Sequence, residues 1–102
     1  MTVKDVLIAA RAKIEKPENW TRGMSARDAD GQYISPRDPK AVCWCSAGAV
    51  YASVPLVGVM PSSRVLRALD DVSGNSIETF NDNMPHSEVL AVFDQAIAAQ
   101  PN

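Results

Sequence analysis

The chain has 102 residues, with ten basic and twelve acidic side chains and a formal net charge of −2 at neutral pH. A chain of this length buries about two-thirds of its unfolded surface on folding, so it requires neither a disulfide framework nor a structural metal, and its hydrophobic fraction of 46% argues against intrinsic disorder. The near-neutral charge argues against a nucleic-acid partner, because domains that bind nucleic acid carry a basic excess.

The first predicted helix spans Val3 to Glu15. Thr2 is suited to the N-cap position, because its hydroxyl can accept a hydrogen bond from the backbone of Asp5 at the third helical position. Pro17 ends the helix, since proline clashes with the preceding turn and restricts the residue before it. At about 100° per residue, the apolar side chains fall on one face, which comprises Val3, Val6, Leu7, Ala10 and Ile14.

Residues 18–39 lack helical periodicity and are rich in Asp, Arg, Gly and Pro. Within them, the stretch from Ala26 to Ser35 predicts a small β-hairpin, because Asp30-Gly31 supplies the positive φ angles that a tight turn requires. A two-stranded hairpin is marginally stable alone. We therefore expect it to be inserted after the first helix and to pack against the other helices.

The central helix is predicted over about Lys40 to Ser53. Asp38-Pro39 is typical of a helix start, with aspartate as the cap and proline at the first helical position. The segment is apolar nearly all round, which is typical of a helix surrounded by neighbours. Pro55 ends it.

Two further helices are predicted in the C-terminal half. The first runs from Pro61 to about Ser73 with Gly74 as its C-terminal cap, and Ser76–Phe80 adds one helical turn. The last helix runs from about His86 to Ala99. The expected fold class is mainly α (α+β): one domain over residues 1–102 with four main helices and a hairpin insertion at 18–39.

One set of residues has the parts of a thiol-dependent hydrolase or transferase. Cys45 lies near the start of the central helix, where partial positive charge can lower a thiol pKa. His86, the only histidine, would serve as its base, and Asp82 or Asn81 would orient the imidazole. We favour the structural alternative, because free cysteine usually packs as a small buried hydrophobe and nothing in the sequence brings His86 beside Cys45.

The sequence predicts no metal and no cofactor. On a helix, Cys43 and Cys45 would point about 200° apart, and a zinc site would need two further ligands when only His86 is present. The aspartates of the hairpin lack the spacing of a calcium loop. No glycine-rich phosphate loop is present either.

Two surfaces are candidates for binding: the first for another protein or a second copy of the chain, the second for a nucleic acid. The apolar segment 54–60 either tucks beneath the domain or remains exposed as a contact surface. Its candidate contact residues are Leu56, Val57, Val59 and Met60. Arg27 and Arg37 concentrate positive charge around the hairpin, but interleaved aspartates cancel most of it, so nucleic-acid binding there is not favoured.

The chain is expected to be cytoplasmic, with no membrane contact. No apolar run approaches the roughly 18–20 residues of a membrane helix. The N-terminal segment carries charges within its apolar stretch, whereas a signal peptide keeps them in front of a continuous apolar block.

Several stretches in a fixed order resemble a known family. They include Trp44-Cys-Ser-Ala-Gly-Ala49, Phe80-Asn-Asp82 and the segment His86–Ile97 with its Phe93-Asp-Gln-Ala-Ile97 ending. Together they resemble a family of small proteins of bacteria and their phages that carry a domain of unknown function. The resemblance covers nearly the whole chain and implies a phage or prophage setting, but it implies no activity.

The favoured function is therefore a non-enzymatic accessory or regulatory factor that binds another protein. It rests on the near-neutral charge, the incomplete catalytic set and the helical core. The alternative is the small thiol-dependent enzyme that uses Cys45 and His86.

Overall fold

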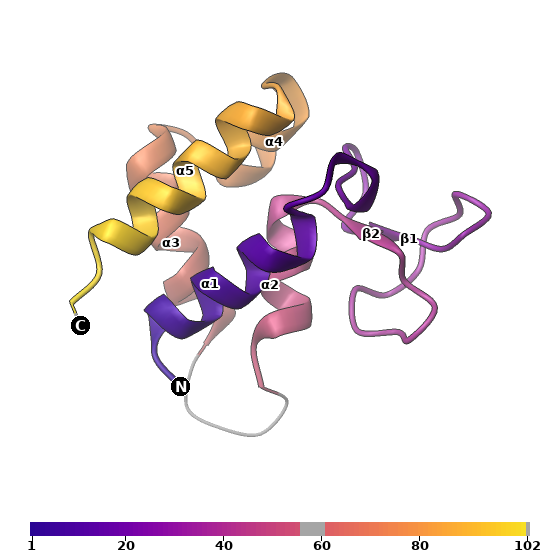
Figure 1. Cartoon of the computed structure of the whole chain (residues 1–102), viewed down its shortest axis with the longest axis horizontal. Coiled ribbons are helices and arrows are strands. Elements are labelled where there is room, and N and C mark those ends of the chain that lie inside the picture. The colour runs from indigo at the N-terminus through magenta and orange to yellow at the C-terminus, as the bar shows by residue number, and fades with distance from the viewer. Residues whose placement is uncertain (56–60, 102) are drawn as a thin grey trace.

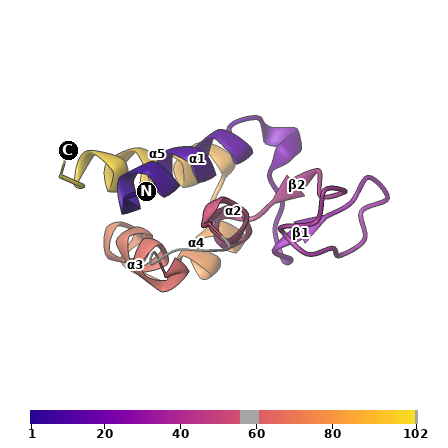
Figure 2. The same cartoon turned by 90° about the horizontal axis from the view of Figure 1, so that it is seen from below.

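The computed structural model describes residues 1–55 and 61–101. Within these ranges the elements are α1 (Val3–Ile14), the 3₁₀ helix η1 (Pro17–Asn19), β1 (Ala26–Arg27), β2 (Cys43–Trp44), α2 (Ser46–Ser53), α3 (Ser62–Ser73), α4 (Ile77–Asn83) and α5 (His86–Ala98). The helices gather on one side and the two strands with their loops project from the other (Figure 1), an arrangement that Figure 2 shows from below. The mainly helical fold with a small hairpin is confirmed. The count of four helices is corrected to five in the described residues, because the expected turn at Ser76–Phe80 is the longer helix α4.

Helix α1 begins at the predicted cap. The Thr2 hydroxyl accepts a hydrogen bond from the Asp5 backbone at 3.1 Å, and the Asp5 carboxylate accepts one from the Thr2 backbone at 3.0 Å. These two bonds satisfy N–H groups that have no partner inside the helix. The buried face consists of Val6, Leu7, Ala10 and Ile14.

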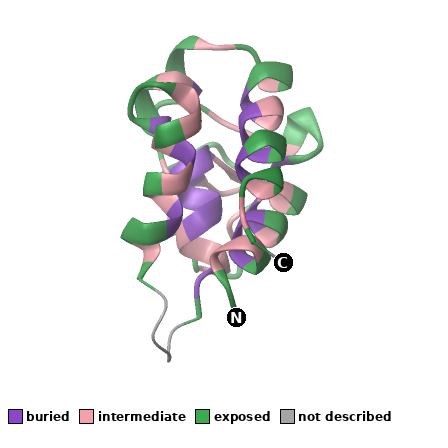
Figure 3. Ribbon diagram, turned by 90° about the vertical axis from the view of Figure 1, so that its left-hand side faces the viewer, coloured by how far each residue is buried: buried purple, intermediate pink, exposed green. Residues whose placement is uncertain are grey.

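Helix α2 lies at the centre of the helical part and contacts α1, α3 and α4. Its small residues allow these neighbours to pack closely. The buried residues run along the inward faces of the surrounding helices, as Figure 3 shows in purple. The largest fully buried apolar side chains of the core are Phe93, Leu7, Ile14, Leu69 and Ile77.

The predicted start of the central helix was wrong by six residues. Asp38-Pro39 forms a turn instead, in which the Asp38 carboxylate accepts a hydrogen bond from the Lys40 backbone at 2.9 Å. The chain then stays extended, because the Val42 backbone donates to the Arg27 carbonyl at 2.9 Å and Cys43–Trp44 pairs with β1. Long-range pairing with β1 thus overrides the local helix signal.

The partner strand of the hairpin also differs from the prediction. A turn does form at residues 28–31, where Gly31 has a φ of 79° and donates its N–H to the Asp28 carbonyl at 3.0 Å. Across this turn, however, the pairing consists of an isolated bridge between Arg27 and Tyr33 and of backbone hydrogen bonds from Asp28 to Gln32 at 2.9 Å and from Ile34 to Ala26 at 3.3 Å. The antiparallel partner of β1 is β2, which lies outside the 18–39 insertion.

A backbone contact fastens α2 to the segment before β1. The Cys45 N–H donates to the Ser25 carbonyl at 3.2 Å. A Cβ atom added to Gly48 would lie 1.8 Å from the same oxygen. Only glycine permits this approach, so Gly48 fixes how closely the hairpin and α2 can pack.

Candidate functional site

His86 is the first residue of α5 and is partly buried. Its Nε2 lies 2.6 Å from the Ile14 carbonyl oxygen. Because that oxygen can only accept, Nε2 carries the proton and donates it. The ring also packs against Trp20 at a centroid distance of 5.2 Å. His86 therefore satisfies one of the last carbonyls of α1.

Cys45 is the N-cap residue of α2, and its Sγ accepts a hydrogen bond from the Gly48 backbone at 3.3 Å. Burial raises the pKa of the Cys45 thiol above its ordinary value; backbone hydrogen bonds from Gly48 and Ala47 oppose the rise, and the charges of Asp82 and Glu78 add to it. The thiol is therefore protonated at neutral pH. A nucleophilic cysteine requires the opposite shift of its pKa.

Asn81 is fully buried and connects three segments. Its Oδ1 accepts hydrogen bonds from the Ser46 backbone at 3.0 Å, the Ser46 hydroxyl at 2.6 Å and the Trp20 indole N–H at 2.7 Å. Its Nδ2 donates to the Thr21 carbonyl at 3.0 Å. The amide thus joins α4 to the start of α2 and to the segment after η1, a role that its sequence position did not reveal.

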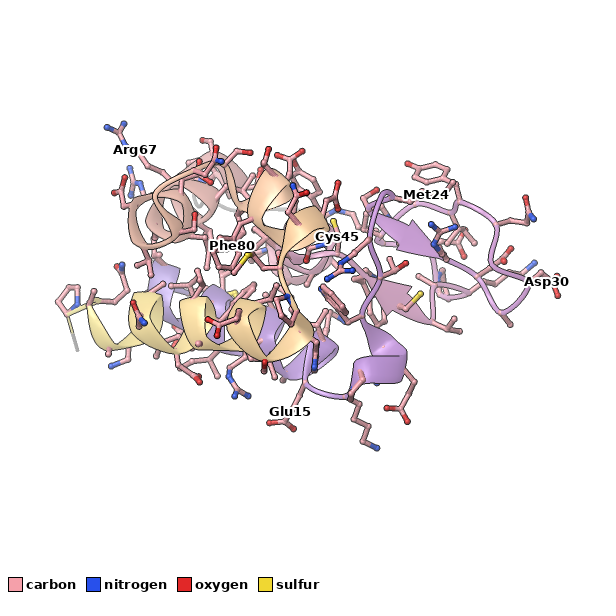
Figure 4. The ribbon with its side chains drawn as sticks, turned by 90° about the horizontal axis from the view of Figure 1, so that it is seen from above. Glu15, Met24, Asp30, Cys45, Arg67 and Phe80 are labelled. Carbon is pink, nitrogen blue, oxygen red and sulfur yellow. The ribbon has the colours of Figure 1, made fainter. Side chains whose placement is uncertain are left out.

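Asp82 and Cys45 lie together at a small cavity of about 130 Å³. The Asp82 carboxylate accepts a hydrogen bond from the Gly23 backbone at 3.0 Å. Figure 4 shows Cys45 at the junction between the helices and the hairpin, beside α4. The described residues that line this cavity do not include His86. The structure thus brings Cys45 and Asp82 together, whereas His86 contacts Ile14 and Trp20.

The side chain of Arg27 braces the hairpin. It donates to the Thr21 hydroxyl at 2.9 Å, to the Gly31 carbonyl at 3.0 Å and to the Arg22 carbonyl at 3.0 Å. Arg37, by contrast, is exposed and lines a groove. The other candidate binding residues, Leu56, Val57, Val59 and Met60, lie outside the described residues.

That groove, called here the Trp44 groove, combines polar and aromatic groups near the hairpin. Its volume is about 390 Å³, and it lies between α1, α2 and the loop before β2. The Trp44 indole donates to the Pro36 carbonyl at 3.0 Å, and the Lys13 ammonium lies 4.8 Å from its ring centroid. The groove is lined by Lys13, Pro36, Arg37, Asp38, Pro39, Ala41, Trp44 and Ala52.

The sequence placed Trp44 inside the predicted central helix and identified Arg37 only as part of the positive charge around the hairpin. The groove combines residues from three separate segments, so no local motif marks it. The one available signal was the proline pair in Pro36-Arg-Asp-Pro39 close before a tryptophan, because prolines and an aromatic side chain form rigid contact surfaces.

Within residues 1–55 and 61–101, no group of three or more His, Cys, Asp or Glu side chains is arranged to hold a metal ion. The helical geometry expected to point Cys43 and Cys45 apart is absent, because both residues lie in extended backbone and not on a helix. In the described part of the chain, no helix has the length and apolar character needed to cross a membrane.

Comparisons with known proteins agree with the resemblance in the sequence. A search of curated proteins found no significant match, and neither did a search of solved structures. The model of one protein family matches residues 1–99, and that family is described as a family of unknown function, DUF6197. Because the match covers almost the whole sequence, the chain belongs to the DUF6197 family.

Proposed function

We propose that the protein is a non-enzymatic binding module that recognises another protein through its hairpin end. In this proposal residues 1–102 act as one domain, in the cytoplasm, as an accessory or regulatory factor of a phage or prophage. The phage setting is supported by the motifs of the sequence alone. The binding role is supported by the surface around the Trp44 groove.

The observation that carries the proposal is the concentration of exposed apolar side chains at the hairpin. Five large hydrophobic residues are exposed in the described part of the chain, and three of them lie between Gly23 and Trp44. These three are Met24, Tyr33 and Val42, with exposed fractions of 39%, 60% and 44%. Aromatic and methionine side chains are enriched in the contact surfaces of proteins.

The environment of Cys45 and His86 argues against the thiol-dependent enzyme. A thiol hydrolase requires a thiolate and a base within hydrogen-bond reach. Here burial raises the thiol pKa, the imidazole donates to the Ile14 carbonyl, and the Asn81 amide is engaged by Trp20, Thr21 and Ser46. Each group of the candidate set already has a partner that stabilises the fold.

Site-specific photo-crosslinking in bacterial cells that produce the protein tests the binding role. A photoreactive amino acid replaces Tyr33, and a control replaces Ile8, which is 48% exposed on α1. We expect the probe at position 33 to capture one protein that the probe at position 8 does not capture. Equal capture at both positions, or no capture at position 33, would refute the proposal.

A further inference from the structure

We propose that the Trp44 groove binds an acidic peptide segment, in which a carboxylate side chain stands beside an apolar one. This inference rests on the proposed function and specifies its ligand. Three features of the groove support it. Two cations form no ion pair in the described residues, a hydrogen bond fixes the indole ring of Trp44, and two prolines make the walls rigid.

Neither cation of the groove forms an ion pair in the part of the chain that the structure describes. In the described residues the ion pairs join Arg11 to Glu15 and Arg11 to Asp94. Neither Lys13 nor Arg37 takes part in them, although both line the groove.

Asp38 supplies the one carboxylate among the described residues that line the groove. This carboxylate accepts a hydrogen bond from the Lys40 backbone. It is thus engaged by its own turn. The described lining of the groove therefore carries two positive charges and one negative charge, in a protein whose formal net charge is −2. Such a local reversal of charge attracts acidic ligands.

The apolar part of the groove is held in place before any ligand arrives. The Trp44 indole is fixed by its hydrogen bond to the Pro36 carbonyl, and Pro36 and Pro39 have restricted backbones. Ala41 and Ala52 complete the lining. A preformed surface loses little conformational entropy on binding, and the volume of about 390 Å³ lies within the range of about 300–1,000 Å³ found for ligand pockets.

A peptide fits the groove better than a single-stranded nucleic acid does. Base stacking needs a free aromatic face beside a continuous basic track. The Lys13 ammonium lies over the Trp44 ring, and the two cations of the described groove lining, Lys13 and Arg37, do not make a continuous basic track. A carboxylate can instead pair with Lys13 and Arg37 while its neighbouring side chain packs on the indole edge and the prolines.

Selection from a random peptide library tests the inference with the intact chain. We expect enriched peptides to carry Asp or Glu next to an apolar residue, and to shift the indole N–H resonance of Trp44 in NMR spectra of the ¹⁵N-labelled protein. The double variant Lys13→Glu/Arg37→Glu should bind the selected peptides about tenfold more weakly, since exposed ion pairs contribute a few-fold each. Raised salt should weaken wild-type binding.

The matched control is Lys16→Glu/Arg67→Glu, which changes the net charge equally at exposed residues outside the groove lining. It should bind the selected peptides as the wild type does. All four substituted side chains lie at the surface or in part at the surface, and circular dichroism establishes that both variants fold. Equal losses in the two double variants would mean that only net charge matters and would overturn the inference.

Three other outcomes would also overturn it. Enrichment of neutral or basic peptides that shift Trp44 would keep protein binding at the groove but reject the acidic ligand. A Trp44 shift with an oligothymidylate probe and none with the peptides would point to nucleic acid. If no peptide binds while the probe at position 33 still captures a protein, the acidic ligand fails and the proposed function stands.

Discussion

The buried amide of Asn81 offers the sharpest test of how this fold is held together. In Asn81→Leu the side chain keeps a similar volume but can neither accept nor donate hydrogen bonds. The Ser46 backbone N–H and hydroxyl lose their partner at a fully buried position. The Trp20 indole and the Thr21 carbonyl also lose theirs, but these groups are partly exposed and can bind water.

The magnitude follows from the number of groups left without partners. A buried polar group that loses its hydrogen bond costs about 1–3 kcal/mol. The two buried groups of Ser46 therefore predict a loss of about 2–6 kcal/mol in the free energy of unfolding, with little added by the rehydrated groups. This is a large part of the stability of a small domain, which is typically about 5–15 kcal/mol.

Urea unfolding followed by far-ultraviolet circular dichroism measures this loss, provided that the m-value is unchanged. The control is Asn83→Leu on the same helix, where the side chain is exposed and bonds only to the Thr79 carbonyl. It should change stability by at most about 1 kcal/mol. A double-mutant cycle adds Ser46→Ala, which should cost less in Asn81→Leu than in the wild type. A loss below about 1 kcal/mol for Asn81→Leu would refute the reasoning.

Four further predictions concern single residues. Gly48→Ala should lower the melting temperature strongly or prevent folding, because the added methyl would meet the Ser25 carbonyl at 1.8 Å and backbone moves less easily than a side chain; a melting temperature equal to wild type would contradict this. His86→Ala should lose about 1 kcal/mol of stability through the bond to Ile14, and His86→Gln, which retains a donor, should recover part of it in the same urea assay. Because burial raises the thiol pKa of Cys45, alkylation of native Cys45 by iodoacetamide should be slower than that of an unfolded control, and a fast reaction would revive the enzyme hypothesis. The same shift makes the stability depend on pH. Below the ordinary thiol pKa of 9.0 the folded and the unfolded protein both hold the proton, whereas above 9.0 the unfolded thiol ionises first, so the stability falls. Cys45→Ser should remove this part of the pH dependence.

The sequence correctly predicted the helix ends that are set by residues at the end itself. The Thr2 cap and the Gly74 C-cap lie where their side-chain and backbone chemistry requires, with Gly74 at a φ of 76°. The predicted start of α2 was wrong because residues 42–45 are held by β1 and by the Ser25 carbonyl, which lie at least 15 residues earlier. Asp38 does accept a hydrogen bond from the backbone as a cap would, but it caps a turn and not a helix.

The candidate site was less predictable, because it depends on distances between remote segments. The sequence identified Cys45, His86, Asp82 and Asn81 as polar or reactive groups, but it could not assign their partners. His86 bonds to a residue 72 positions away, and Asn81 bonds to residues 35 to 61 positions away. The Trp44 groove combines Lys13, the 36–44 segment and Ala52, which no periodicity links.

The direct passage from β2 into α2, with only Cys45 between them, links the groove to the core. A ligand seated against Trp44 would rest on a strand that continues into the helix bearing the fully buried Ala49 and Val50. Occupancy would thus restrict the opening motions of that helix, and amide hydrogens at its centre would exchange with solvent more slowly. Hydrogen exchange in the core would thus reveal ligand binding at the groove, without any rearrangement of the backbone.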